Sequence, residues 1–190
     1  GYRIFVAEVA STCNEALLMQ YLLKNTTDSK ERAVLINHFL EQFKGTLYRQ
    51  TMFAEFELEI NERAAKGESL TASALCDIYR KLNEDYFGPD MEIDDNIALE
   101  WARIPHFYYD YYVYQYATGF SAAIALSDKI LNEGEPAVRR YLNFLCSGCT
   151  KDPVSLLRDA GVDMSGPEPV ETALKLFNSL MDEMEELLLK

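Results

Sequence analysis

Apolar residues recur at helical spacing through almost the whole chain, and this pattern limits the possible fold more than any other feature. No stretch alternates apolar and polar residues between turn residues, as a half-buried strand would. The sequence therefore predicts an all-α fold, with residues 1–190 forming a single all-helical region. The expected helices cover about 2–24, 28–66, 71–87, a short segment ending before Pro105, 106–132, 137–146, 153–160 and 168–189.

Capping and helix-breaking residues set these boundaries. Asp28 or Ser29 is expected to cap the very long second helix, and Lys66-Gly67 to end it. Thr71 is expected to cap the next helix, which stops at Phe87-Gly88-Pro89. Long helices separated by short connections are thus the expected architecture.

Charge and hydrophobicity exclude two kinds of partner. The chain has 18 Lys and Arg against 31 Asp and Glu, a net charge of −13, so nucleic acid is not expected to bind. No apolar run approaches the roughly 18 residues that a membrane span needs. The chain opens on Gly1 without a signal peptide, and we expect it to be a piece of a longer cytoplasmic protein.

The four cysteines give little indication of function. Cys146 and Cys149 form a Cys-x-x-Cys pair, whereas Cys13 and Cys76 stand alone in helical patterns. No second Cys/His pair lies nearby to complete a metal site, and no strand–helix unit accompanies the pair as in redox proteins. We interpret them as incidental reduced thiols, with a redox or metal role for the pair as the alternative.

A polar stripe interrupts the apolar start of the chain. Four side chains would share one face of the first expected helix: Glu8, Ser11, Thr12 and Glu15. A carboxylate among apolar residues is costly unless it is paired or binds a metal. Periodicity alone leaves both readings of Glu8 open: pairing with an Arg or a Tyr hydroxyl, or metal ligation.

Tyrosines are concentrated in the segment 106–116. Six of the chain's 12 tyrosines lie within nine residues there, directly after His106. On the expected aromatic helix, Tyr111 and Tyr114 would share a face. Their phenols could donate hydrogen bonds to a substrate carbonyl or an oxyanion, or instead reach backbone carbonyls within an aromatic core.

The chain by itself lacks a complete set of catalytic groups. It has two histidines, His38 and His106, and neither belongs to a His-Glu-x-x-His pair. A glycine-rich phosphate loop and a Gly-x-Ser-x-Gly elbow are also missing from the sequence.

Four blocks of the sequence resemble one family. They are residues 2–18, with Phe5-Val6-Ala7-Glu8-Val9-Ala10-Ser11-Thr12, then 45–57, 104–117 with Tyr111-Tyr112-Val113-Tyr114, and 151–164. Together they resemble the M3 family of zinc peptidases, of the oligoendopeptidase F and thimet type. The resemblance implies an all-helical, two-lobed cleft enzyme of zincin type that hydrolyses short peptides.

The resemblance also implies how zinc is bound. In that family, two histidines of a His-Glu-x-x-His helix and a Glu on the next helix hold one Zn²⁺, and Glu8 matches that Glu. The His-Glu-x-x-His helix is absent from this sequence, so we expect the chain to be the C-terminal part of the catalytic domain. The missing N-terminal part would then be its partner, and the isolated chain should not hold zinc tightly.

Roles for the aromatic residues follow from the same resemblance. Tyr111, Tyr114 and His106 match catalytic positions that contact the tetrahedral intermediate, and Tyr108, Tyr109 and Tyr112 match substrate-binding positions. The alternative is a non-catalytic helical fragment or protein-interaction module. An apolar surface left by the missing part would also favour self-association.

Overall fold

The computed structural model describes residues 3–189, and all regular structure in that range is helical. The all-α prediction is confirmed. The elements in chain order are the 3₁₀ turn η1 (Ile4–Val6), α1 (Val9–Asn25), α2 (Ser29–Gln42), the π-helical segment η2 (Phe43–Tyr48), α3 (Arg49–Ala65), α4 (Ala72–Phe87), the 3₁₀ segments η3 (Asp95–Arg103) and η4 (Pro105–Tyr108), α5 (Tyr114–Glu133), α6 (Glu135–Ser147), α7 (Pro153–Asp159) and α8 (Glu168–Leu188).

The chain divides into two compact units. The first combines the residues up to Leu47 with those from Gln115 onward, and the second is Tyr48–Tyr114. The region expected as a single one therefore contains two separately packed parts. Over residues 3–189, no helix is both long enough and apolar enough to span a bilayer.

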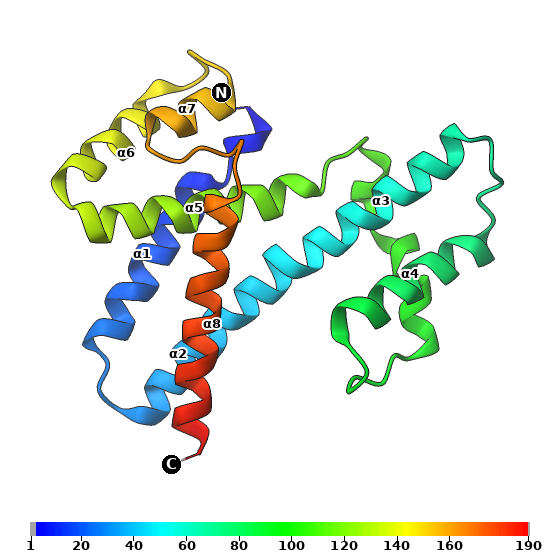
Figure 1. Cartoon of the computed structure of the whole chain (residues 1–190), viewed down its shortest axis with the longest axis horizontal. Helices are drawn as coiled ribbons and strands as arrows, with labels where there is room; N and C mark the ends of the chain where they lie inside the picture. The colour runs from blue at the N-terminus through cyan, green and yellow to red at the C-terminus, as the bar shows by residue number, and fades with distance from the viewer. Residues whose placement is uncertain (1–2, 190) are drawn as a thin grey trace. The chain divides into compact units, whose positions relative to one another are not determined.

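The core of the first unit is built on aromatic contacts. In this unit α2 packs against α1 and α8, and α6 packs against α7 (Figure 1). Phe43 is fully buried, and its ring meets those of Phe39, Phe120 and Phe177 at centroid distances of 5.3, 4.9 and 5.4 Å. Offset and edge-on ring pairs of this kind stabilise a core beyond their area burial.

The second unit has its own apolar core. Here α4 packs against both α3 and η3 (Figure 1). Phe56 of α3 and Tyr79 of α4 are buried and meet edge to face, 5.3 Å apart. Both rings therefore lie at the interface between the two helices.

Local capping fixes several boundaries as expected. The Asp28 carboxylate accepts hydrogen bonds from the N–H groups of Lys30 and Glu31, and the Thr71 hydroxyl accepts one from the N–H of Ala74. The long helix predicted over 28–66 is helical from Ser29 to Ala65, but η2 interrupts its α-helical geometry. The sequence pattern does not predict this π-helical segment.

Two helix boundaries were predicted wrongly. The helix expected from residue 2, which lies outside the described residues, begins only at Val9, because the chain first makes the turn η1. Val6 and Val9 both belong to one buried cluster around this break. The helix expected over 106–132 begins at Tyr114, and the residues before it form a short 3₁₀ turn and a bend.

Candidate functional site

The tyrosine-rich segment 105–114 is a bent connection rather than a helix. After η4, Asp110 and Tyr111 have φ angles of +51° and +55°, in the left-handed region. This conformation costs a residue other than glycine about 1–2 kcal/mol. Tyr111 and Tyr114 consequently do not share the face of a helix, and that part of the prediction is wrong.

A buried carboxylate contacts the backbone of this bend. Glu57 of α3 is 1% exposed, and its Oε1 accepts the N–H of Tyr111 at 2.7 Å. The backbones of Tyr112 and Val113 also interact favourably with the charged form of this side chain. Burial raises the pKa of Glu57, the three backbone interactions lower it, and the net direction is upward.

Apolar residues hold the segment on both sides of the bend. The ring of Phe107 lies 5.6 Å from that of Phe53 and 5.1 Å from that of Phe56. Val113 is fully buried. The segment is thus attached to the core of the second unit at Phe107 and ends at the buried Val113, and most of the residues between these two are exposed.

Most of the predicted phenols between and beside these anchors face outward. Tyr108 is 78% exposed and Tyr109 is 59% exposed, while Tyr111 and Tyr114 are 42% and 41% exposed. The alternative of an aromatic helix core is therefore wrong for these four side chains. Their rings are accessible to a ligand.

Three of the predicted side chains form an aromatic cluster. The ring of His106 stacks on Tyr112 at 5.5 Å and meets Tyr109 edge-on at 5.9 Å. Tyr109 and Tyr112 lie 5.8 Å apart. The bend therefore gathers an imidazole and two phenols, which can donate hydrogen bonds and stack against a flat or apolar group.

Glu8 lies in the first unit, at the N-cap of α1. It is exposed, and its backbone carbonyl accepts the N–H of Thr12 and the hydroxyl of Ser11, each at 3.0 Å. The prediction that it lies within a helix face is corrected, because the helix begins one residue later. An exposed carboxylate carries no burial penalty, so it does not require a protein partner.

Glu8 is chemically suited to bind zinc as an anionic oxygen ligand. Among residues 3–189, however, no group of three or more His, Cys, Asp or Glu side chains is arranged to hold a metal ion. The described residues therefore offer one donor rather than a complete site.

The cysteines differ in their surroundings. Cys146 and Cys149 are exposed, whereas Cys13 is buried in α1. Burial raises the pKa of the Cys13 thiol to about 11, which keeps it protonated at neutral pH. Cys13 is thus a core residue.

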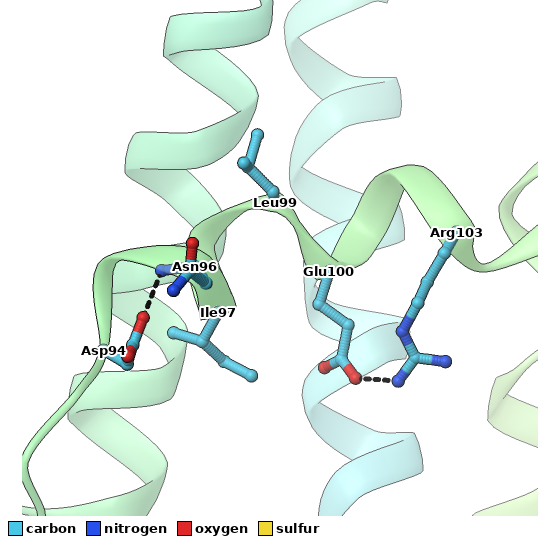
Figure 2. Close-up of a pocket in the computed structure, with 6 residues that line it drawn as sticks. All are labelled: Asp94, Asn96, Ile97, Leu99, Glu100 and Arg103. Atoms are coloured by element: carbon cyan, nitrogen blue, oxygen red, sulfur yellow. Dashed lines mark hydrogen bonds and ion pairs between the residues drawn. The ribbon is translucent and has the colours of Figure 1, made fainter.

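A second buried carboxylate, Glu100, lies beside an open hollow. The hollow has a volume of about 470 Å³ and runs along η3 (Figure 2). Glu100 pairs with Arg49 and Arg103 and accepts the Tyr79 hydroxyl at 2.6 Å. Its charge is thereby balanced within the protein, which is typical of a structural group rather than a catalytic one. The hollow is lined by Asp94, Asn96, Ile97, Leu99, Glu100 and Arg103.

Sequence reasoning missed both buried carboxylates. Glu57 follows Phe53 by four residues and therefore lies on the same apolar face of α3. A carboxylate in that register is a signal that could have identified Glu57. Nothing comparable marks Glu100, whose partners come from three separate elements.

Comparison with known proteins decides the family. The sequence pattern of peptidase family M3 matches residues 1–176. The chain belongs to peptidase family M3. The resemblance noted in the sequence is thereby confirmed.

Two relatives of this M3 chain are named an oligopeptidase and an oligoendopeptidase. It is 60% identical to oligopeptidase PepF of Bacillus subtilis, over all of this chain and 28% of that protein. It is 46% identical to the chromosomal oligoendopeptidase F of Lactococcus lactis subsp. cremoris, over all of this chain and 31% of that protein. The chain thus spans less than a third of the length of these relatives.

A solved structure agrees with the M3 fold. The crystal structure of oligoendopeptidase-F from Enterococcus faecium superposes with a TM-score of 0.94 at 49% identity, covering 98% of this chain and 36% of that one. The helical architecture expected from the resemblance is therefore that of an oligoendopeptidase F.

Proposed function

We propose that this chain is part of a zinc metalloendopeptidase that hydrolyses short peptides. The observation that carries the proposal is the bent segment 105–114, which exposes several phenols and stacks the half-buried His106 on Tyr112, while Phe107 contacts Phe56 and Val113 is buried. Membership of the M3 family and similarity to proteins named oligopeptidase and oligoendopeptidase support the same activity.

The phenols supply hydrogen-bond donors for a peptide. Tyr111 or Tyr114 donates to the oxygen that becomes negatively charged when the scissile carbonyl is attacked, and His106 assists at the same centre. Tyr108, Tyr109 and Tyr112 bind the backbone or side chains of the substrate. Flat phenol and imidazole rings suit this role, because they bind both apolar side chains and peptide carbonyls.

Glu8 supplies one anionic ligand for zinc, and the other ligands come from outside this chain. The bound metal supplies Lewis-acid activation of the substrate carbonyl and of a water molecule. The position of Glu8 at the start of α1 leaves its side chain exposed and so accessible to a metal ion. In its ionised form it binds as a carboxylate without the cost of burial.

The test uses the complete peptidase with Tyr111→Phe and Tyr114→Phe variants and a quenched-fluorescence peptide. At least one variant should lose about 10²–10³ in kcat with a smaller change in KM, because an oxyanion donor acts chiefly in the transition state. Tyr21→Phe on α1, which is also exposed to solvent but lies in the first unit, is the matched control. Wild-type kcat in both site variants would refute the oxyanion role.

The metal role of Glu8 has its own test. Glu8→Gln in the complete peptidase should lower zinc content after dialysis against a chelator, because a neutral amide is a weaker ligand than a carboxylate. Glu15→Gln removes the same charge from an exposed position of α1 and should keep its zinc. Equal zinc content in the two variants would exclude Glu8 as a ligand.

A further inference from the structure

The bend that carries the tyrosines depends on a conformation that its own sequence disfavours. Asp110 and Tyr111 are consecutive non-glycine residues with positive φ. Side chains on L-residues rarely tolerate this region, so a partner outside the bend must stabilise it. Neither residue is buried, so packing of their side chains does not provide that support.

Glu57 is the partner that the structure provides. With Asp110 and Tyr111 in this conformation, the N–H group of Tyr111 donates to the Glu57 carboxylate, and the backbones of Tyr112 and Val113 interact with the same carboxylate. Successive backbone groups that converge on an anion in this way form an anion-binding nest. Here the anion belongs to the chain itself, 54 residues earlier on α3.

The position of Glu57 makes this contact rigid. Its side chain is buried, and the neighbouring Phe56 packs against Phe107 of the same bent segment. A buried carboxylate is costly unless its oxygens accept hydrogen bonds, so Glu57 and the bend each require the other. The raised pKa of Glu57, caused mainly by burial, agrees with this environment.

We propose that Glu57 is a positioning residue that holds the bend in the conformation in which Tyr111 and the neighbouring aromatic side chains meet the peptide substrate. This inference rests on the proposed peptidase function. It adds a residue that contacts no substrate and acts through the backbone of Tyr111, Tyr112 and Val113.

Substitution by glutamine separates this role from general packing. The new amide side chain in a Glu57→Gln variant would keep the volume of the glutamate but offer one acceptor oxygen, and its N–H₂ group would face backbone N–H groups. The anchors at Phe107 and Val113 would remain, so the unit should fold while the bend between them loosens. Glu62→Gln is the control, because it removes the same charge from a solvent-accessible residue of α3 that forms a surface ion pair with Lys66.

The first measurement is amide hydrogen exchange in the complete peptidase, read on peptides that cover residues 109–114. Exchange there should become about tenfold faster in Glu57→Gln and stay unchanged in Glu62→Gln, because only the first change takes the carboxylate acceptor from the N–H of Tyr111. Unchanged exchange in Glu57→Gln would overturn the inference. Glu57→Asp keeps both oxygens on a shorter stem and should restore part of the protection.

The second measurement is peptide hydrolysis in single and double variants. Glu57→Gln should lower kcat by about 10- to 100-fold with a smaller change in KM, since misplacing reacting groups by about 1 Å has effects of this size. In the background of whichever tyrosine variant, Tyr111→Phe or Tyr114→Phe, loses kcat, the same substitution should have a much smaller effect, because both changes remove one interaction. Multiplicative losses, or normal kcat despite faster exchange, would overturn the positioning role.

The tyrosine variants distinguish failure of the proposed function from failure of the inference about Glu57 alone. If Tyr111→Phe and Tyr114→Phe both hydrolyse the peptide with the kcat of the wild type, these tyrosines have no part in catalysis. The positioning role of Glu57 is then overturned as well. If the tyrosine variants are slow but Glu57→Gln is not, the proposed function stands and only the inference about Glu57 fails.

Discussion

Tyr79→Phe tests the buried contact between α4 and η3. The Tyr79 hydroxyl is fully buried and donates to Oε2 of Glu100 at 2.6 Å, whereas Arg49 and Arg103 both bind Oε1. The substitution keeps the ring and its contacts with Phe53 and Phe56 but removes the donor to Oε2. A hydrogen bond to a charged group contributes about 1.5–3 kcal/mol, and a loss of that size is expected here.

Urea denaturation followed by circular dichroism measures this loss. The midpoint should fall by on the order of 1 M at an unchanged slope, because the same surface is exposed on unfolding. Tyr86→Phe is the matched control: it lies on the same helix, and its hydroxyl donates to the exposed Glu55 at 3.0 Å. This control should change the free energy of unfolding by no more than about 0.5 kcal/mol.

The stability that the contacts of Glu100 contribute should depend on pH in a definite direction. Burial alone would raise the pKa of Glu100, but the Tyr79 hydroxyl and the two arginines outweigh it, and the net shift is below the ordinary value of 4.5. A depressed pKa in the folded state adds stability above pH 4.5 that is lost as the pH falls through the depressed value. The difference in the free energy of unfolding between wild type and Tyr79→Phe should therefore be largest at neutral pH and become smaller in acid. Equal midpoints for Tyr79→Phe and Tyr86→Phe at neutral pH would refute the reasoning.

Two further predictions concern the first unit. Iodoacetamide at mildly alkaline pH should modify the exposed Cys146 and Cys149 of the native protein long before Cys13, because burial raises the pKa of the Cys13 thiol to about 11. Mass spectrometry measures the order of labelling. Rapid labelling of Cys13 would contradict its placement in the core. The Arg158 guanidinium and Ser165 hold the pKa of Asp163 well below its usual range, so its stabilising effect is present above the ordinary value of 3.8 and is lost in acid. Asp163→Asn should accordingly lower the melting temperature at neutral pH, and a deficit that persisted unchanged at acid pH would argue against this origin.

Local sequence determined most of the helices. Asp28 and Thr71 cap α2 and α4 because a side-chain oxygen satisfies nearby N–H groups, an interaction that spans only two or three residues. The apolar spacing that predicts α4 and α8 also acts within a few turns. The family could likewise be identified from short blocks of residues, because such blocks are read directly from the sequence.

The sequence predicted candidate site residues but not the backbone that carries them. The density of tyrosines after His106 marked the segment that bends in the structure, and Glu8 was proposed through the family resemblance; their roles stay predictions. Helical propensity then predicted the wrong backbone for residues 109–113. It also placed Glu8 inside a helix that begins at Val9.

Tertiary structure decided the parts that depend on distant partners. The left-handed bend at Asp110 and Tyr111 is unfavourable by itself. It is stabilised by Glu57, a residue of α3 whose carboxylate accepts the N–H of Tyr111. Glu100 is likewise balanced by Arg49 and Tyr79, which come from two other helices. Helix formation is a local equilibrium that the sequence alone can specify, whereas a buried carboxylate and a strained backbone become stable only when folding brings their partners together.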